Sequence, residues 1–259
     1  MKLQDKVVFI TDGENPSGRA ILKRFAAEGA SFVINCPSND ASILDELEPY
    51  RLRGSTIKIV QIDLCSSAEV TAMLDRTAAE MGSIDILIHN NHLVKPASVE
   101  YSDEGLFYEM LNTNAKTAFV TTQLVGKQMS SREKGKIVFI GSIHAEKPTG
   151  SSFIFSAAKG AVQMLSREAS LVLGRFGVNV NHIQLGPTVG DDLVYQSSYS
   201  PLYEDYEYKI PNAILGTFDD LANLALFLVS DEARYINGAD IRIDGGFLNH
   251  YLDVKTKKP

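Results

Sequence analysis

A serine, a phenylalanine and a lysine mark the stretch of this sequence in which chemically useful side chains are most concentrated. Ser142 closes an apolar run, Phe155 follows thirteen residues later, and Lys159 lies four residues beyond the phenylalanine. A hydroxyl and an ammonium group can hold a substrate oxygen, and His144, two residues after the serine, can exchange a proton near neutral pH. A phenyl ring has no proton to give, so Phe155 itself supplies no acid–base catalysis.

The spacing of these residues resembles the catalytic set of the short-chain dehydrogenase/reductase family, in which a tyrosine stands where this chain has Phe155. The resemblance implies a nicotinamide-dependent oxidoreductase, with a lysine that lowers the tyrosine pKa and a serine that steadies the substrate oxygen. Asn114 matches the family's active-site asparagine. General acid–base catalysis contributes roughly 10²–10⁴-fold, so we expect the family mechanism to be crippled unless His144 or a tyrosine of a later loop replaces the missing donor.

The turn after the first apolar run, Thr11 to Gly18, resembles the family's TGxxxGxG dinucleotide motif but departs from it at two glycines. Asp12 replaces the first and brings a carboxylate near the phosphates, whereas Pro16 replaces the second and has no N–H to donate. Losing one hydrogen bond to a charged group costs about 1.5–3 kcal/mol. We therefore expect NAD or NADP, if either binds, to bind weakly.

The resemblance also implies which residues would contact a cofactor. The segment 35–39 after the second strand offers neither the acid of NAD-preferring relatives nor the base of NADP-preferring ones, so the preference stays open. After the sixth strand, the family's proline-glycine becomes Leu185-Gly186, and Gly190 stands where a threonine is common. Carried over residue by residue, the cofactor-binding set is Thr11, Gly13, Gly18, Asp63, Asn90, Lys159 and Gly186.

Three histidines follow two strand patterns, and adjacent strands would bring them to one edge of a sheet. His89 and His92 leave the fourth strand, and His144 lies just beyond the fifth. Imidazoles are the commonest metal ligands, but no nearby cysteine or strong acid completes a set. We expect no metal site.

The segment from Asp191 to Tyr208 contains five acids, five tyrosines and no Lys or Arg. Family members use this region, about 188–215 here, as a mobile lid over the substrate. A tyrosine-rich lid suits the enclosure of a small-molecule ligand or a protein interface, where tyrosine is enriched. The alternative is a solvated loop whose tyrosines pack back on the domain.

Apolar strand patterns alternate with helical patterns along the chain, which is typical of a doubly wound parallel sheet with ligands at the carboxyl ends of its strands. We predict an α/β fold, a single Rossmann-type domain over 1–259, with about seven strands, helices on both faces and a short basic tail at 254–259. The expected strands are 7–11, 31–36, 57–62, 84–88, 137–141, 178–183 and 239–243, and the expected helices are 19–28, 218–229 and stretches that begin near 41, 67, 104 and 153.

The composition narrows the classes of partner. A net charge of −7 argues against a nucleic-acid partner, because that affinity rests on clustered cations. The longest apolar run, Leu224 to Val229, is far too short for a membrane span, and the first residues lack the apolar core of a signal peptide. Cys36 and Cys65 form no CxxC pair and are expected to be reduced. We expect a cytoplasmic protein.

Three functional hypotheses follow. The leading one is a catalytically degraded family member that acts through binding or as a structural or regulatory subunit. The rival is a working oxidoreductase on a carbonyl or alcohol, with His144 or a lid tyrosine as the proton donor, and the third is a binder of a non-nucleotide ligand in the inherited pocket. The stretches 104–130, 153–175 and 239–247 resemble the family's interfaces, so we expect a tetramer of this chain or with an active homologue.

Overall fold

The computed structural model describes residues 1–38, 42–148, 150, 152–189, 210–212 and 214–250. Seven strands form one sheet in the order β3-β2-β1-β4-β5-β6-β7, and every neighbouring pair is parallel. The strands are β1 (Val7–Ile10), β2 (Ser31–Asn35), β3 (Ile57–Val60), β4 (Ile86–His89), β5 (Gly135–Ser142), β6 (Val178–Leu185) and β7 (Asp240–Ile243). The predicted parallel α/β sheet is confirmed.

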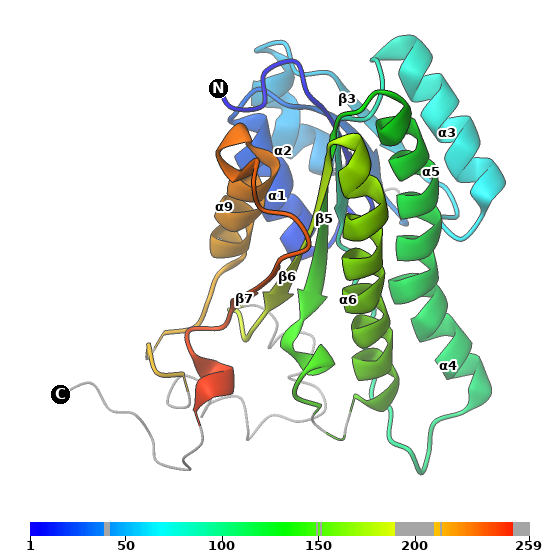
Figure 1. Cartoon of the computed structure of the whole chain (residues 1–259), viewed down its shortest axis with the longest axis vertical. Helices are drawn as coiled ribbons and strands as arrows, with labels where there is room; N and C mark the ends of the chain where they lie inside the picture. Colours follow the sequence, from blue (N-terminus) through cyan, green and yellow to red (C-terminus); the bar gives the residue numbers. More distant parts are fainter. Residues whose placement is uncertain (39–41, 149, 151, 190–209, 213, 251–259) are drawn as a thin grey trace.

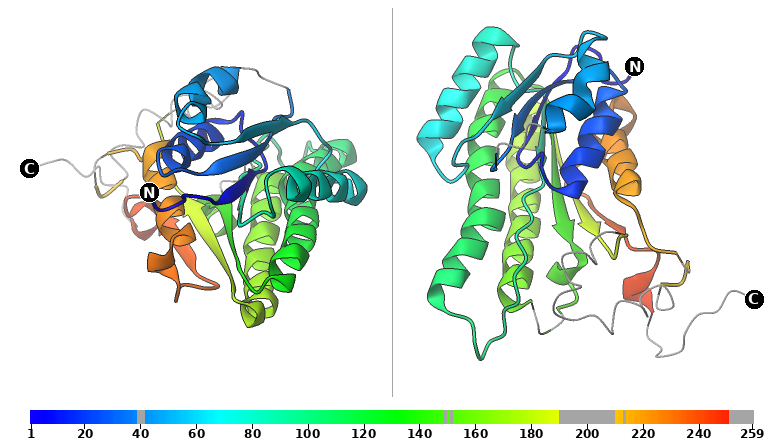
Figure 2. Two further views of the ribbon diagram at one scale, coloured as in Figure 1. Left: turned by 90° about the horizontal axis from the view of Figure 1, so that it is seen from above. Right: turned by 180° about the vertical axis from the view of Figure 1, so that it is seen from behind.

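Helices cover both faces of this sheet (Figures 1 and 2). One face carries a core that α1, α2 and α9 share with the sheet, and the other carries a core shared with α3, α5 and α6. The helices are α1 (Pro16–Ala26), α2 (Ser42–Arg51), α3 (Ser67–Glu80), α4 (Glu104–Leu111), α5 (Thr117–Ser131), α6 (Phe153–Leu173) and α9 (Phe218–Val229). The prediction of helices on both faces is confirmed.

Each central strand contributes side chains to both cores, because successive side chains of a strand point to opposite faces of the sheet. In β1, Val8 and Ile10 belong to one core, whereas Val7 and Phe9 belong to the other. All four side chains are buried. A strand buried on both faces must be apolar throughout, which is why its sequence shows a continuous apolar run and no alternation.

Two helix boundaries differ from the sequence-based expectation. Helix α1 begins at Pro16 and not near residue 19, because Asn15 caps it by accepting a hydrogen bond from the Gly18 amide and proline suits the first helical position. The long stretch after residue 104 is interrupted by a π-helical turn, Asn112–Lys116, between α4 and α5. This turn contains Asn114, one of the proposed catalytic residues.

The carboxyl ends of the strands gather at one edge of the sheet, where the chain leaves β1 toward β2 and leaves β4 toward β5 in opposite directions. Such a switch point is where open α/β sheets place their ligands. The proposed lid falls largely on residues 190–209 and 213, which lie outside the described residues, as does the basic tail. Among the described helices, none has the length and apolar character that crossing a membrane requires.

Candidate functional site at the carboxyl ends of the strands

Strand β5 ends at Ser142, and the chain turns at once into a short 3-10 helix, Ile143–Ala145. The Ser142 hydroxyl oxygen accepts a hydrogen bond from the His144 amide at 3.2 Å and lies 2.9 Å from His144 Nδ1. The serine side chain is therefore the cap of this turn as well as a partner of the imidazole. The local turn, not a distant contact, brings the two groups together.

Phe155 lies near the start of α6 and is fully buried. Its ring meets the His92 ring edge-on at a centroid distance of 4.9 Å and the His144 ring at 5.6 Å. The Lys159 ammonium nitrogen lies 5.5 Å from the same ring centroid. The structure thus gathers Ser142, His144 and Lys159 around a phenyl ring, and the ring contributes no hydroxyl to this cluster.

Lys159 is fully buried on the next turn of α6. Its Nζ donates to the Asn91 carbonyl at 2.8 Å and approaches the Ile140 carbonyl at 3.4 Å. Both partners are uncharged, and burial lowers the pKa of Lys159 to about 7. Near neutral pH this amine is consequently divided between its charged and neutral forms.

The three histidines do not converge. Burial lowers the pKa of His144, and burial followed by the charges of Lys159 and His144 lowers that of His92 to about 3. His89 is fully buried, with Nε2 3.0 Å from the Thr117 hydroxyl. That hydroxyl donates to the Thr113 carbonyl, so His89 carries its proton on Nε2.

His89 therefore packs toward α5, while His92 and His144 flank the phenyl ring. All three histidines stand at or just beyond the carboxyl ends of the adjacent strands β4 and β5, but the side chain of His89 points into the helical layer beside its strand. Among the described residues, no group of three His, Cys, Asp or Glu side chains is arranged to hold a metal ion.

Asn114 holds the segment that follows β4. Its Oδ1 accepts from the Leu93 amide at 3.0 Å, and its Nδ2 donates to the Leu93 carbonyl and to the Met110 carbonyl, both at 2.9 Å. The side chain is fully buried. These bonds give the side chain a structural role at the π-helical turn, and the catalytic role of its backbone stays a prediction.

The first turn is held by its own carboxylates. Asp12 Oδ1 accepts from the Glu14 amide at 3.0 Å and from the Asn15 amide at 3.2 Å. The Glu14 carboxylate accepts from the Ser38 amide, with oxygens at 3.0 and 2.9 Å, and so ties the turn to the loop after β2. Burial raises the pKa of Asp12, against the opposing effect of these amide bonds. Backbone donors at this edge already have acidic partners.

Asn90, the residue just after β4, also holds the first turn through its side chain. Its Oδ1 accepts from the Asp12 amide at 3.0 Å, and its Nδ2 donates to the Asp12 carbonyl at 2.6 Å. The Asn90 amide in turn donates to the Thr11 hydroxyl at 3.0 Å. Two residues of the proposed cofactor set, Thr11 and Asn90, therefore bind each other and the turn.

Three glycines of the proposed set lie where a side chain would collide. A Cβ at Gly13 would come within 2.2 Å of Ile34, and one at Gly18 within 2.1 Å of the Asp12 carbonyl oxygen. At Gly186 a Cβ would lie 2.5 Å from that of Asp244. Close packing within the fold accounts for all three glycines, and contact with a cofactor is not needed to explain them.

A cavity of about 440 Å³ opens at the carboxyl ends of β2 and β3. Its walls come from the ends of β2 and β3, from the segment after β4 and from the π-helical turn. Asp63, the last member of the proposed set, lines it and accepts from the Cys65 amide at 2.8 Å, so it shapes its own turn as well. The lining includes Asn35, Ile62, Asp63, Asn91, Glu109 and Lys116.

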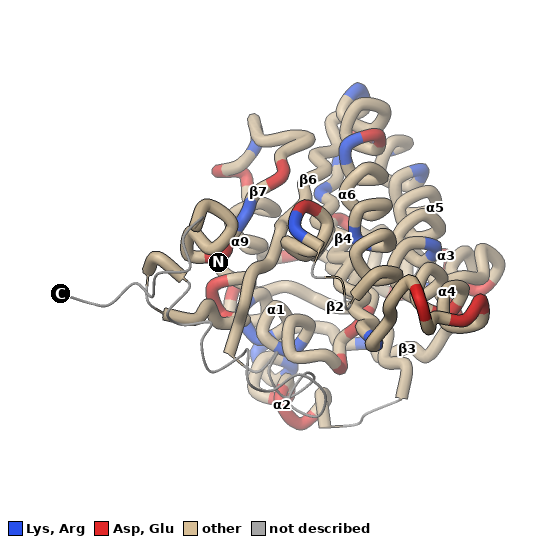
Figure 3. Tube along the Cα trace, turned by 90° about the horizontal axis from the view of Figure 1, so that it is seen from below, with Lys and Arg blue, Asp and Glu red and all other residues tan. Residues whose placement is uncertain are grey.

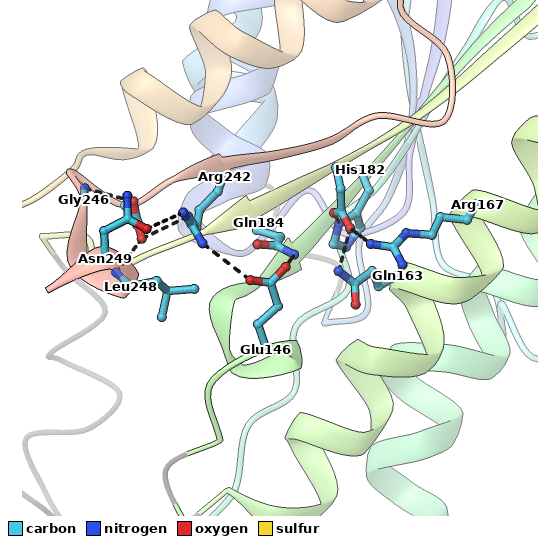
Figure 4. A network of polar contacts seen from close by, with 11 residues as sticks. Glu146, Gln163, Arg167, His182, Gln184, Arg242, Gly246, Leu248 and Asn249 are labelled. Atoms are coloured by element: carbon cyan, nitrogen blue, oxygen red, sulfur yellow. Dashed lines mark hydrogen bonds and ion pairs between the residues drawn. The ribbon is translucent and has the colours of Figure 1, made fainter. Parts of the chain in front are cut away.

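No pattern in the sequence indicated the network of polar side-chain contacts that joins β6 to β7 (Figure 4). His182 Nδ1 pairs with Asp240, which also accepts from Gln163 and Arg167 of α6. Burial opposes the charged form of Asp240, but these hydrogen bonds outweigh it and hold the pKa of Asp240 below its ordinary value.

A second set of polar contacts in the same network links the turn after β5 to β6 and β7. Gln184 donates to Glu146 at 2.7 Å, and Arg242 approaches the same carboxylate at 3.5 Å. Since Glu146 lies two residues beyond His144, these two contacts hold in place the turn that carries the His144 imidazole. The strands that supply these partners are distant in sequence, so no local signal could have revealed them.

Comparison with known proteins places this arrangement among oxidoreductases. A family model described as enoyl-(acyl carrier protein) reductase matches residues 15–248. A 2,5-dichloro-2,5-cyclohexadiene-1,4-diol dehydrogenase of Sphingobium indicum is 30% identical over 247 residues, which cover 95% of this chain and 97% of the relative.

Solved structures agree in fold over nearly the whole chain. A gluconate 5-dehydrogenase from Burkholderia cenocepacia, in complex with NADP and tartrate, is 25% identical with a TM-score of 0.87, and the match covers 96% of this chain and 98% of that one. A short-chain type dehydrogenase/reductase from Mycobacterium marinum is also 25% identical, with a TM-score of 0.83 and coverage of 95% and 96%.

Proposed function

Because this chain belongs to the short-chain dehydrogenase/reductase family of oxidoreductases, we propose that it is a member in which the family's proton transfer has been lost and which acts through binding or as a subunit. The observation that carries the proposal is Phe155, a buried phenyl ring at the position of the proton donor. Acid–base catalysis supplies roughly 10²–10⁴-fold. Without a hydroxyl at this position, Ser142 and Lys159 have no donor to support.

The first turn supports the same proposal, because the residues present do not fit a dinucleotide well. A pyrophosphate at this turn would need backbone donors that Asp12 Oδ1 already occupies. It would also approach the carboxylates of Asp12 and Glu14, and Pro16 offers no N–H. Each hydrogen bond lost to a charged group costs about 1.5–3 kcal/mol. The relative from Burkholderia cenocepacia was solved with NADP, and we propose that this chain binds NAD or NADP much more weakly.

A second candidate function is a working oxidoreductase in which His144 exchanges the proton. The observation that favours it is the 2.9 Å contact between His144 Nδ1 and the Ser142 hydroxyl. Burial lowers the pKa of His144, which favours the neutral imidazole. A neutral imidazole suits a base that accepts a proton from an alcohol better than an acid that protonates a carbonyl. This candidate therefore predicts alcohol oxidation in preference to carbonyl reduction.

Titration of the purified protein with NAD, NADH, NADP and NADPH tests the proposal. We expect dissociation constants weaker than millimolar for all four, and no turnover of a panel of ketones, aldehydes and alcohols. Calorimetry or nucleotide fluorescence reads the binding. A dissociation constant of tens of micromolar or less would overturn the proposal and move the second candidate to first place, and His144→Gln would then have to abolish alcohol oxidation.

We also propose that the chain associates with itself or with an active homologue through its helical face. Helix α6 leaves four large apolar side chains exposed, and the neighbouring helix α5 exposes Phe119. Exposed apolar side chains that gather on one face of a protein are typical of an interface. The exposed apolar members of α6 are Phe153, Met164, Leu171 and Val172.

A further inference from the structure

The Ser142 hydroxyl and the His144 imidazole form a pair that is capable of chemistry without a hydride donor. Ser142 Oγ lies 2.9 Å from His144 Nδ1, and it accepts a hydrogen bond from the His144 amide at 3.2 Å. Because the amide already donates to Oγ, the hydroxyl keeps its own proton to donate, and Nδ1 is the acceptor that faces it. A hydroxyl within hydrogen-bond reach of a base is the arrangement in which serine acts as a nucleophile.

The imidazole of this pair is in the form that a base requires. Burial lowers the pKa of His144, so the ring is neutral near neutral pH. A neutral imidazole that carries its proton on Nε2 has a lone pair on Nδ1, and this nitrogen can accept the serine proton. The ring also packs edge-on against Phe155 at a centroid distance of 5.6 Å. The pair therefore has a base of the right charge, with one side of its ring in contact with an apolar side chain.

The surroundings of the pair favour an uncharged substrate. The pair stands at the carboxyl end of β5, the edge at which open α/β sheets place their ligands. Ser142 is 5% exposed and His144 is half-buried, so the imidazole borders solvent. Leu93 and Val94 pack against the small core that contains Phe155. Apolar side chains at this edge suit a short acyl group and give no partner to a charged one.

Lys159 is the other nucleophile of the same cluster, since an amine with a pKa of about 7 is partly neutral near neutral pH. It is fully buried, however, and its Nζ is directed to the carbonyl oxygens of Asn91 and Ile140. Ser142 instead has a half-buried base beside it. The geometry therefore favours the serine over the lysine as the group that meets a substrate.

We propose that Ser142 and His144 transfer the acyl group of small uncharged esters in a reaction that needs no dinucleotide. Ser142 Oγ attacks the ester carbonyl carbon, and its proton passes to His144 Nδ1. The bond from that carbon to the leaving alcohol oxygen then breaks, and the imidazolium returns the proton to the alcohol. Water attacks the resulting acyl-serine with His144 again as the base, which releases the carboxylic acid and restores the hydroxyl. The inference goes beyond the proposed function and does not depend on it.

The test uses p-nitrophenyl acetate near neutral pH, with release of nitrophenolate as the rate and mass spectrometry of the acid-quenched, digested protein as the map. We expect a burst of about one nitrophenolate per chain, the kinetic sign of an acyl-enzyme, and an acetyl group on Ser142. Added NADH should change neither result. Acetylation of Lys159 or of surface side chains while Ser142 stays unmodified would overturn the inference.

Variants separate catalysis by the pair from a merely structural role. Ser142→Ala and His144→Gln should each slow the burst at least about tenfold, because a positioned base contributes roughly 10²–10⁴-fold. The double variant should be no slower than Ser142→Ala, since the two groups act as a unit. Ser142→Cys should restore acylation, because a thiol is intrinsically more nucleophilic. Additive losses, or no rescue by cysteine, would contradict the assignment.

The matched control is Ser131→Ala/His250→Gln, which removes a hydroxyl and an imidazole from the end of α5 and from the segment after β7. It should keep the native burst, and circular dichroism should show the native fold for every variant. If the native chain is not acylated, this inference falls and the proposed function stands. If NAD or NADP binds at tens of micromolar while Ser142 is acylated, the proposed function falls and this inference stands.

Discussion

Phe155 and Lys159 occupy successive turns of α6 and determine each other's surroundings. The phenyl ring excludes water from the amine, and no carboxylate is among the groups to which Nζ is hydrogen-bonded in the described structure. Burial without a charged partner is the condition that lowers a lysine pKa, here to about 7. At the scale of single residues, the site therefore has the Lys159 amine with a lowered pKa, and at position 155 it lacks the hydroxyl whose pKa such an amine would lower.

Replacement of Phe155 by tyrosine tests whether the missing hydroxyl is the only defect. If it were, carbonyl reduction should rise by about the 10²–10⁴ that acid–base catalysis supplies. We expect no such rise, because a hydride donor must also be held nearby, and positioning is worth several kcal/mol. The measurement is turnover of ketones and aldehydes with NADH and NADPH by Phe155→Tyr, and then by the same variant with Asp12→Gly/Pro16→Gly. Strong activity of the single variant would mean that the cofactor site is intact.

The lowered pKa of Lys159 predicts a pH-dependent stability. Between the folded-state pKa of about 7 and the ordinary value near 10.4, the unfolded chain binds more protons, so stability rises with pH. In Lys159→Met this contribution is absent. From about pH 7 to pH 9, the free energy of unfolding of the native chain should rise by about 2 kcal/mol relative to the variant. Urea denaturation at the two pH values measures this, and equal pH dependence would contradict it.

At the scale of elements, the first turn depends on a strand that lies far from it in sequence. Asn90 leaves β4 and bonds both the amide and the carbonyl of Asp12, so the turn between β1 and α1 is fixed by its neighbour in the sheet. A cofactor motif would need these atoms in the same place. The turn can therefore keep the shape of a dinucleotide motif although its amide donors are hydrogen-bonded to Asp12 and are not available to a phosphate.

Asn90→Ala should destabilise the fold, because it leaves two polar backbone groups of Asp12 without partners in a part-buried position. Each buried polar group left unpaired costs about 1–3 kcal/mol, so we expect a loss of at least about 2 kcal/mol. Asn112→Ala, at an exposed position at the start of the π-helical turn, is the matched control and should change stability by about 0.5 kcal/mol or less. Chemical denaturation followed by circular dichroism gives both values. Similar losses in the two variants would refute the role assigned to Asn90.

At the scale of the whole molecule, charge and apolar surface are distributed differently. Acidic and basic positions are interspersed over the helices of the described chain (Figure 3). Helix α6 carries four of the exposed large apolar side chains, more than any other described helix or strand, and among them Met164 is 53% and Leu171 is 67% exposed. Burial of such side chains in a second subunit gains about 25 cal/mol for each Å² of apolar surface. The helical face is therefore the proposed site of self-association.

Light scattering at micromolar concentration tests this association. We expect the native chain to form a tetramer, and Met164→Glu/Leu171→Glu to give a smaller species, because each charge would have to be desolvated in the interface. Leu52→Glu, which changes an exposed leucine just beyond α2, is the control and should keep the native mass. A native chain that is monomeric under these conditions would contradict the proposal, as would a double variant of unchanged mass.

The sequence by itself determined the parallel sheet, most of its strands, and the cluster of Ser142, Phe155 and Lys159, because each of these depends on local periodicity or on a short spacing along β5 and α6. It also identified Asp12 and Pro16 as departures from a dinucleotide turn. The tertiary structure alone decided that the Glu14 carboxylate accepts from the Ser38 amide and that His89 faces α5. It likewise decided that His182 pairs with Asp240, 58 residues away. Contacts between strands that are adjacent in the sheet and distant in the chain leave no local pattern, since their geometry is set by strand order and by the side chains packed between them.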